Sequence, residues 1–461
     1  MIEGPSGSGP RNADQDQPFL RLTENPYHSS SSESPQSQPL SPDRDDLREQ
    51  RKGAFYPLVL NEFPLLPSTR SDPVPEYVRD LINIQFPLGD QNALPNMTWE
   101  AVKKHAVTRG ALTLLVRVYR CRQRQPQQIA LTDSTNKMLL AHLQGELRKD
   151  NFDADDAIAA LRVVSIYLFD GGKGPWDGFL ALALRYVGNI LRLSRYRGPR
   201  DALLDCNAKD AFIIKTVLWY DVLASVTLQR PPTTLSVIDE MFNPMRSGIR
   251  VEETINQQYS MISPMGCENN VVWALAKTSA LSCWKRDQIR GGTLSAPGLY
   301  KKAMEINSHL ERDPNQPSPP PLNPMDGRET SRTFAAEIFR TSTRLFLLTI
   351  VNGEYPHVKD VRRGVEDTFN SIKALGLNST VYPSIVRSTV FGLYMCGALT
   401  ENLEHRATLF TYLRTTSTSE SVGNCTAILQ LLEEIWNSRN PQDRSPVNWI
   451  GPLAKEDMLL V

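Results

Sequence analysis

Two groups of carboxylates have a spacing that could support metal-ion chemistry, because acids one helical turn apart can supply oxygen ligands to Mg²⁺ in an all-α lyase or cyclase. Asp45, Asp46 and Glu49 lie in an N-terminal segment that we expect to be disordered, where no pocket can surround an ion. Asp155 and Asp156 open a predicted helix, where acids favour the helix dipole without any metal. We expect both groups to have a structural role. A magnesium-dependent lyase or cyclase is the alternative.

The other residue types with catalytic potential have spacings that fit no known site. The sequence contains neither a CxxC pair nor an HExxH motif, and its six cysteines are Cys121, Cys206, Cys267, Cys283, Cys396 and Cys425. The stretch Gly171-Gly-Lys-Gly174 lacks the Gly-Lys-Ser/Thr ending and the preceding strand of a phosphate-binding loop, so we interpret it as a connection between helices. We therefore predict no catalytic, cofactor-binding or metal-ligating residues, no bound cofactor, and a protein that is not an enzyme.

Two clusters of arginine follow predicted helices. Cations at these positions interact with the free carbonyl groups at a helix C-terminus, which favours solvated helix ends. A nuclear-import signal or a nucleic-acid-binding patch is the alternative for either cluster. The first cluster comprises Arg117, Arg120, Arg122 and Arg124, and the second comprises Arg192, Arg195, Arg197 and Arg200.

The elements that would position these residues are helices. Residues Ala157, Leu161, Val164 and Leu168 repeat at intervals of four, three and four, which places them on one helical face. Asp153 and Asp156 have the spacing of a capping box at the start of that helix. Residues 212–228 are apolar on nearly all sides, so we expect their helix at the centre of the fold. With no convincing alternation of apolar and polar residues, the sequence predicts an all-α, irregular array of about a dozen helices.

Composition narrows the class of protein further. The chain has 461 residues, with 51 Lys and Arg against 51 Asp and Glu, so its formal net charge is zero. Phosphate binding requires a surplus of basic residues, which argues against a free-standing nucleic-acid binder. The most apolar stretch, residues 211–228, contains Lys215 and Asp221 and does not predict a membrane span. The polar N-terminus shows no secretory signal, and we expect an intracellular, reduced protein.

Three regions are expected along the chain. Residues 1–53 form a disordered, acidic, Ser/Pro-rich leader or linker, and residues 54–97 form an extended, Pro-rich lead-in with a short helix near residues 76–84. Residues 98–461 form the helical region. The stretch 313–325 has six prolines in thirteen positions, which leaves open whether the helical region is one body or two lobes, 98–311 and 328–461.

The order and texture of the helices resemble those of the fungal-specific transcription factor domain, the helical regulatory region that follows a zinc cluster in fungal regulators. The likeness covers roughly residues 75–461. It rests on the segments 210–232 (DAFIIKTVLWYDVLASVTLQRPP), 266–295, 336–369, 380–410 and 428–440 (ILQLLEEIWNSRN).

The resemblance implies a nuclear, non-catalytic regulator of RNA polymerase II genes that forms a homodimer or meets a coregulator through its helices. Relatives bind zinc and DNA through a separate six-cysteine cluster, and this sequence lacks its spacing. DNA would then be reached through a cluster outside this sequence or through a partner, and both explanations stay open. A cytosolic scaffold or a metabolite-binding module without DNA access is the alternative. Residues 428–432 and 449–461 could provide a docking surface, although core packing is favoured.

Overall fold

The computed structural model describes residues 73–89, 93–125, 128–245, 258–311, 327–376, 382–420, 422–440 and 442–461. The regular structure in these ranges is helical, without a strand, which confirms the predicted all-α class. None of the described helices has the length and apolarity required to cross a bilayer. The predicted leader, residues 1–53 with Asp45, Asp46 and Glu49, lies outside the described residues, as does the Pro-rich stretch 313–325.

The described part of the chain contains more helices than the dozen expected. Several of them have only four to seven residues, too few for hydrophobic periodicity to indicate them. In chain order the elements are α2 (Pro73–Glu76), the π-helix η1 (Tyr77–Leu81), α3 (Ile82–Gln85), α4 (Ala93–Lys104), α5 (Ala106–Arg124), the 3₁₀-helix η2 (Ala130–Thr132), α6 (Ser134–Glu146), α7 (Ala154–Phe169), α8 (Asp177–Leu191), α9 (Pro199–Asp205), α10 (Ala208–Thr227), α11 (Leu235–Phe242), α13 (Ile262–Met265), α14 (Asn269–Arg290), α15 (Ala296–Ser308), α16 (Gly327–Asn352), α17 (Lys359–Lys373), α18 (Tyr382–Ser388), α19 (Val390–Leu399), α20 (Leu403–Glu420), α21 (Cys425–Ser438) and α22 (Ile450–Lys455).

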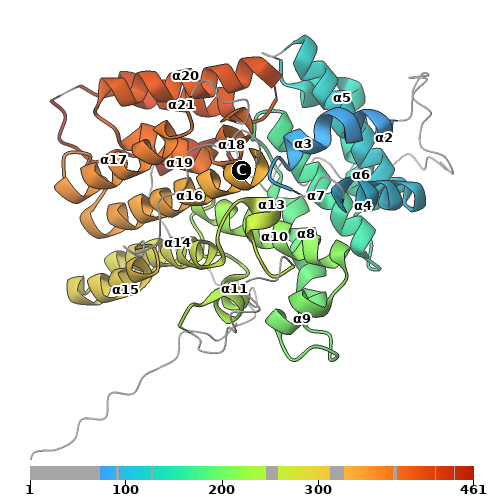
Figure 1. Ribbon diagram of the computed structural model, residues 1–461, viewed down its shortest axis with the longest axis horizontal. Helices are drawn as coiled ribbons and strands as arrows, with labels where there is room; N and C mark the ends of the chain where they lie inside the picture. The colour runs from blue at the N-terminus through green and yellow to red at the C-terminus, as the bar shows by residue number, and fades with distance from the viewer. Residues whose placement is uncertain are drawn as a thin grey trace, which may run out of the picture. The chain divides into compact units, whose positions relative to one another are not determined.

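Helix α10 lies at the centre of residues 68–461, which form one compact unit. It packs against α7, α8, α14 and α22, and Figure 1 shows it between the earlier helices and the C-terminal ones. Its apolar residues are buried on all sides, including Ile213, Val217 and Leu223, which confirms the expectation from residues 212–228. Helices on the two sides of the Pro-rich stretch also pack together, since α16 contacts both α14 and α15.

Of the lead-in, residues 54–97, the structure describes 73–89 and 93–97, which are helical except for the turn at residues 86–89. The short helix expected near residues 76–84 is present. Elements α2, η1 and α3 occupy residues 73–85, and α4 begins at Ala93, which corrects the extended interpretation over these positions. Pro73 stands at the start of α2, where a fixed φ and a missing N–H do not disturb a helix. Val74, Tyr77 and Leu81 are buried, and α2 packs against α5, so tertiary burial stabilises this short helical segment.

Candidate functional site

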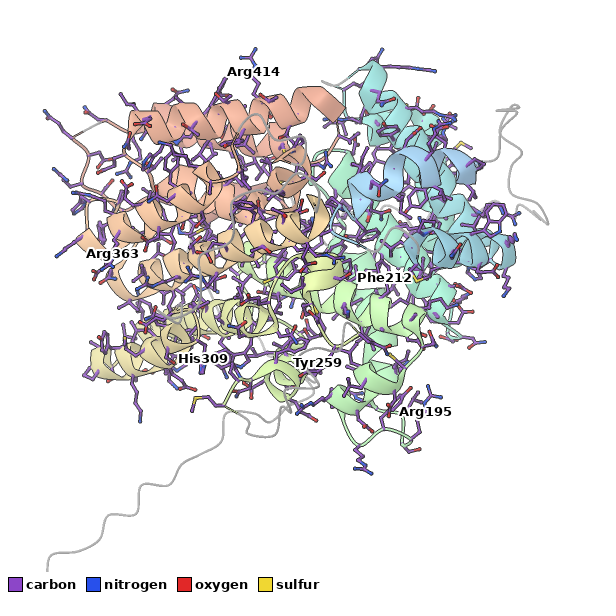
Figure 2. All side chains as sticks on the ribbon, viewed as in Figure 1. Arg195, Phe212, Tyr259, His309, Arg363 and Arg414 are labelled. Atoms are coloured by element: carbon purple, nitrogen blue, oxygen red, sulfur yellow. The ribbon has the colours of Figure 1, made fainter. Side chains whose placement is uncertain are left out.

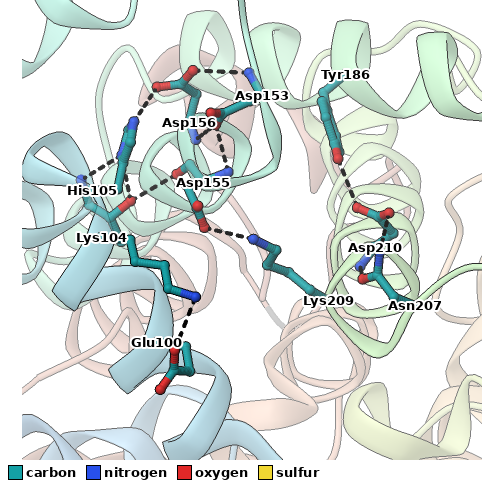
Figure 3. Close-up of polar contacts among 11 residues, drawn as sticks. Glu100, Lys104, His105, Asp153, Asp155, Asp156, Tyr186, Asn207, Lys209 and Asp210 are labelled. Atoms are coloured by element: carbon teal, nitrogen blue, oxygen red, sulfur yellow. Dashed lines mark hydrogen bonds and ion pairs between the residues drawn. The ribbon is translucent and has the colours of Figure 1, made fainter.

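The carboxylates Asp155 and Asp156 form part of a polar cluster at the start of α7 (Figure 3). Asp153 Oδ1 accepts hydrogen bonds from the backbone N–H groups of Asp155 and Asp156, at 2.8 and 3.0 Å. Asp156 Oδ2 in turn accepts from the backbone N–H of Asp153 at 3.0 Å, which completes the predicted capping box. These bonds satisfy backbone N–H groups at the helix start that have no partner within the helix. This is the capping role expected for Asp153 and Asp156.

His105, Asp153 and Asp156 bring three potential metal-ligand atoms within 4.8 Å of one another. However, Asp156 Oδ1 already lies 2.8 Å from Lys149 Nζ and 3.2 Å from His105 Nε2. A cation at this position would face the Lys149 ammonium group, which repels it. Asp155 points elsewhere and pairs with Lys209 Nζ at 3.0 Å. The arrangement is better explained as a structural link between the starts of α5 and α7 than as a magnesium site.

The loop Gly171–Gly174 connects α7 to α8, as expected, and holds the C-terminal segment of the chain. The backbone N–H of Leu459 donates to the carbonyl oxygen of Gly172 at 2.9 Å. Lys173 Nζ forms an ion pair with Glu456 at 3.0 Å, and Trp176 Nε1 donates to the carbonyl oxygen of Asp457 at 2.6 Å. These contacts join the loop to the C-terminal segment, which agrees with its interpretation as a connection between helices.

The C-terminal segment is a core element. Met458, Leu459 and Leu460 are at most 1% exposed, and Figure 1 marks the chain end in the middle of the helices. Leu431 and Leu432 of α21 are buried as well, as is Trp449. These apolar residues pack in the interior, as the sequence favoured, and do not form a docking surface.

The two arginine clusters have different environments. In the first, Arg117 Nε donates to Asn136 Oδ1 at 3.0 Å, Arg120 Nε donates to Glu76 at 2.8 Å, and the buried Arg122 donates to the carbonyl oxygen of Gln128 at 3.1 Å. These three residues tie α5 to its neighbours and are not the solvated residues that the sequence favoured, whereas Arg124 is exposed at the helix end, as expected. In the second, Arg192, Arg195 and Arg197 are exposed between α8 and α9, where Figure 2 labels Arg195.

The cysteines are free, and all except the half-buried Cys121 are buried. Burial raises the pKa of Cys206 to about 11 and that of Cys425 to about 12. A thiol with such a pKa remains protonated at neutral pH and is a poor nucleophile or metal ligand. Their role is to fill the core, as the sequence predicted.

A cavity of about 80 Å³ lies where α3, α7, α10, α13 and α18 converge, and sequence reasoning missed it. Trp219, Phe169 and Met265 contribute apolar walls, and Arg387 contributes a guanidinium group that is only 8% exposed. Burial lowers the pKa of Arg387 to about 10, against smaller opposing effects of Cys425 and Tyr119. Arg387 directly follows the apolar residues Ile385 and Val386, which are buried. This neighbourhood is the signal in the sequence that could have indicated a buried arginine.

The geometry defines an all-α protein with a packed core, a mostly apolar cavity that Arg387 lines, and no catalytic constellation among the described residues. Residues 121–461 match the family described as the fungal specific transcription factor domain, and the chain belongs to that family. This is a family of transcription factors and not of enzymes, in agreement with the expectation that the chain has no catalytic activity. No solved structure gives a significant match to the chain.

Similar proteins include the transcription factor dibT of Pestalotiopsis microspora, 26% identical over 255 residues that cover 50% of this chain and 38% of that protein. The trichothecene biosynthesis transcription regulator of Trichoderma arundinaceum is 24% identical over 184 residues, covering 40% of each chain. The ustiloxin B cluster transcription factor ustR of Aspergillus flavus is 22% identical over 262 residues, covering 53% of this chain and 41% of that protein. The matches thus span about two fifths of each relative's length.

Proposed function

We propose that this chain is the helical regulatory region of a transcription regulator that acts on RNA polymerase II genes in the nucleus. The match of residues 121–461 to the fungal specific transcription factor domain is the observation that carries the proposal. The relatives named above support it, because they are described as transcription factors or as regulators of biosynthetic genes. Genes of a biosynthetic pathway are accordingly the proposed targets.

The helical region meets a second copy of the chain or a coregulator, and DNA is reached through a zinc cluster outside this sequence or through a partner. The zero net charge of the chain supports this indirect access, because direct phosphate binding requires a surplus of basic residues. The exposed residues Arg192, Arg195 and Arg197 are suited to nuclear import, since they present three cations on one loop.

Deletion of the gene, followed by RNA sequencing, tests the regulatory part of the proposal. Transcripts of a group of biosynthetic genes should change, and the unaltered chain should restore them. Fluorescently tagged protein should accumulate in the nucleus. A strictly cytosolic protein together with an unchanged transcriptome would overturn the proposal.

Charge removal tests the import signal separately. Changing Arg192, Arg195 and Arg197 together to Gln should reduce nuclear accumulation, because import signals depend on clustered positive charge. The matched control changes Arg363 and Arg414 to Gln, two exposed arginines on α17 and α20 (Figure 2). Equal nuclear accumulation of the triple variant and the control would show that the loop with Arg192, Arg195 and Arg197 is not the import signal.

A further inference from the structure

The segment 73–89 covers two neighbouring cavities. The larger is the cavity of about 80 Å³ that Arg387 lines. The smaller, of about 20 Å³, lies between α3, α4, α7 and α10 and is lined by Arg162. Gln85 and Phe86 line both of them. A buried water requires about 10–15 Å³ on this scale, so the larger cavity has room for several waters or for a small organic molecule.

The side chain of Gln85 belongs to the lining of both cavities. Its Oε1 accepts a hydrogen bond from Tyr77 OH at 2.6 Å, and its Nε2 donates to Ser165 Oγ at 2.7 Å. Gln85 is half-buried at the end of α3. Tyr77 belongs to the π-helix η1, and single π-helical turns are frequent at functional sites.

Two buried cations face these cavities. Arg162 is 5% exposed, with Nη2 donating to Thr98 Oγ1 at 3.1 Å and its guanidinium group 4.8 Å from the centre of the Tyr77 ring. Its Nε and Nη1 atoms are buried without a hydrogen-bond partner in the described structure. Among the described residues that line the two cavities there is no aspartate or glutamate. Because a buried cation without a counter-ion is costly, the smaller cavity, which Arg162 lines, is electrostatically suited to an anion.

The walls of the larger cavity are mostly apolar. Trp219, Phe169 and Met265 line it, and Phe86 packs edge-on against Phe212 at a ring distance of 5.0 Å (Figure 2 labels Phe212). Walls of this kind suit the apolar body of a ligand and not a phosphate, which requires hydrogen-bond donors on several sides. The smaller cavity has the dimensions of a single polar group.

From this geometry we propose that the two cavities form one binding site for a small carboxylic acid with an apolar body. The carboxylate occupies the smaller cavity, where it accepts hydrogen bonds from Nε and Nη1 of Arg162. The body lies in the larger cavity against Trp219 and Phe169, with Gln85 turned aside between the two parts.

Ligand binding would fix the segment 73–89 on the core. The proposal is independent of the transcriptional role above, because it concerns binding to the isolated protein. Its failure would leave the transcriptional role untouched, and the reverse holds as well.

Isothermal titration calorimetry and thermal unfolding of the purified chain test the site with hexanoate and benzoate. Hexanamide and benzamide serve as uncharged probes of the same shape. The carboxylates should bind and raise the unfolding temperature in proportion to the logarithm of their concentration, and the amides should not. Equal binding of acids and amides, or no binding of either acid up to its solubility limit, would overturn the proposal.

The Arg162→Gln variant should weaken carboxylate binding at least tenfold, because the charged partner of the carboxylate is lost. Arg122→Gln is the matched control, since Arg122 is also buried (6% exposed) but lines neither cavity. An equal loss of affinity in both variants would contradict the assignment.

Gln85→Met keeps the proposal testable if Arg162→Gln does not fold, because Gln85 is half-buried and its replacement removes no charge. Affinity for the carboxylates should change in this variant, while α-helical circular dichroism stays native. In the unaltered chain, hydrogen exchange of the amides of residues 73–89 should slow with hexanoate and not with hexanamide. Unchanged exchange in this segment with hexanoate bound would overturn the location of the site.

Discussion

The side-chain amide of Asn424 donates a hydrogen bond of 2.8 Å to the carbonyl oxygen of Leu459, which lies 35 residues further along the chain. The same amide donates to the carbonyl oxygen of Val461 at 3.1 Å, and Asn424 is only 2% exposed. Met458 is held from the opposite direction by Thr227 of α10, whose hydroxyl donates to its carbonyl oxygen at 2.6 Å. The last residues of the chain are therefore fixed between the central helix and the start of α21.

Replacing Asn424 by Ala should destabilise the protein by about 1–3 kcal/mol, because the buried carbonyl oxygen of Leu459 and the half-buried oxygen of Val461 lose their donor. The measurement is the free energy of unfolding in urea. Asn96→Ala is the control, since Asn96 is exposed on α4, and a surface substitution of this kind changes stability by less than about 0.5 kcal/mol. A similar value for both variants would show that the Asn424 contacts do not stabilise the C-terminal segment.

Replacing Gly172 by Ala should cost at least about 2 kcal/mol, because a left-handed residue gains a Cβ atom in a crowded position. Its φ is 81°, and the added Cβ would lie 2.9 Å from both Asn424 Cβ and Met458 Sδ. Gly188→Ala is the control, since a Cβ there meets nothing within 4 Å and Ala is the better helix former. Thermal unfolding should show a lower midpoint for the first variant and an unchanged or higher midpoint for the control.

Loss of the capping carboxylate in Asp153→Ala should cost about 0.5–2 kcal/mol at neutral pH. Partial burial would raise the pKa of Asp153, but hydrogen bonds from the N–H groups of Asp156 and Asp155, together with nearby His105, lower it overall. A carboxyl group whose pKa is lowered by folding stabilises the protein above its unfolded pKa and loses that effect as the pH falls through the folded value.

The difference in unfolding free energy between the unaltered chain and Asp153→Ala should therefore shrink as the pH falls below the ordinary aspartate value of about 4. Urea titrations at a series of acidic pH values measure it. A difference that stays constant down to the lowest pH at which both proteins fold would show that the ionised carboxylate is not the stabilising form.

Lys215 predicts a second rise of stability with pH, in the alkaline range, because folding disfavours its charged form. Its ammonium group donates to the carbonyl oxygens of Ser260 and Ser263, at 2.8 and 3.0 Å, yet burial lowers its pKa to about 8 from the ordinary 10.5. Between these two values the unfolded chain binds a proton that the folded chain does not, so stability attributable to this residue rises with pH.

The unaltered chain should accordingly gain stability relative to Lys215→Met as the pH rises from about 8 towards 10.5, by about 3 kcal/mol in total. Comparing the two proteins at each pH cancels the contributions of other groups that titrate in this range. A difference that falls with pH would mean that folding stabilises the charged form of Lys215.

Local features were predictable because they depend on neighbouring residues. The capping box at Asp153 and Asp156 requires only a three-residue spacing and a following helix, and the structure contains it. The central position of α10 follows in the same way from residues 212–228, since a helix without a polar face must be buried. The all-α class results from many such local patterns acting together.

Proline content misled the interpretation of the lead-in. The sequence suggested a mostly extended chain up to residue 97 with one short helix near residues 76–84. The helical stretch begins earlier, at Pro73, and α4 follows from Ala93, with contacts to α5 holding the first turns. Short helices of this kind are unstable in isolation, so their presence depends on the surface against which they pack. Only the tertiary structure provides that surface.

The sequence by itself thus determined the helical class, the central helix and the resemblance to a family of regulators. The tertiary structure decided which charged side chains are buried and which segments the loops contact. Arg162 and Arg387 are 225 positions apart in the numbering, yet both line cavities that share Gln85 and Phe86. Likewise Gly172 meets Leu459 only because α7, α10 and α21 assemble around the C-terminal segment. Periodicity and capping act within a few residues, whereas a cavity forms where distant segments meet, and no local pattern specifies that meeting.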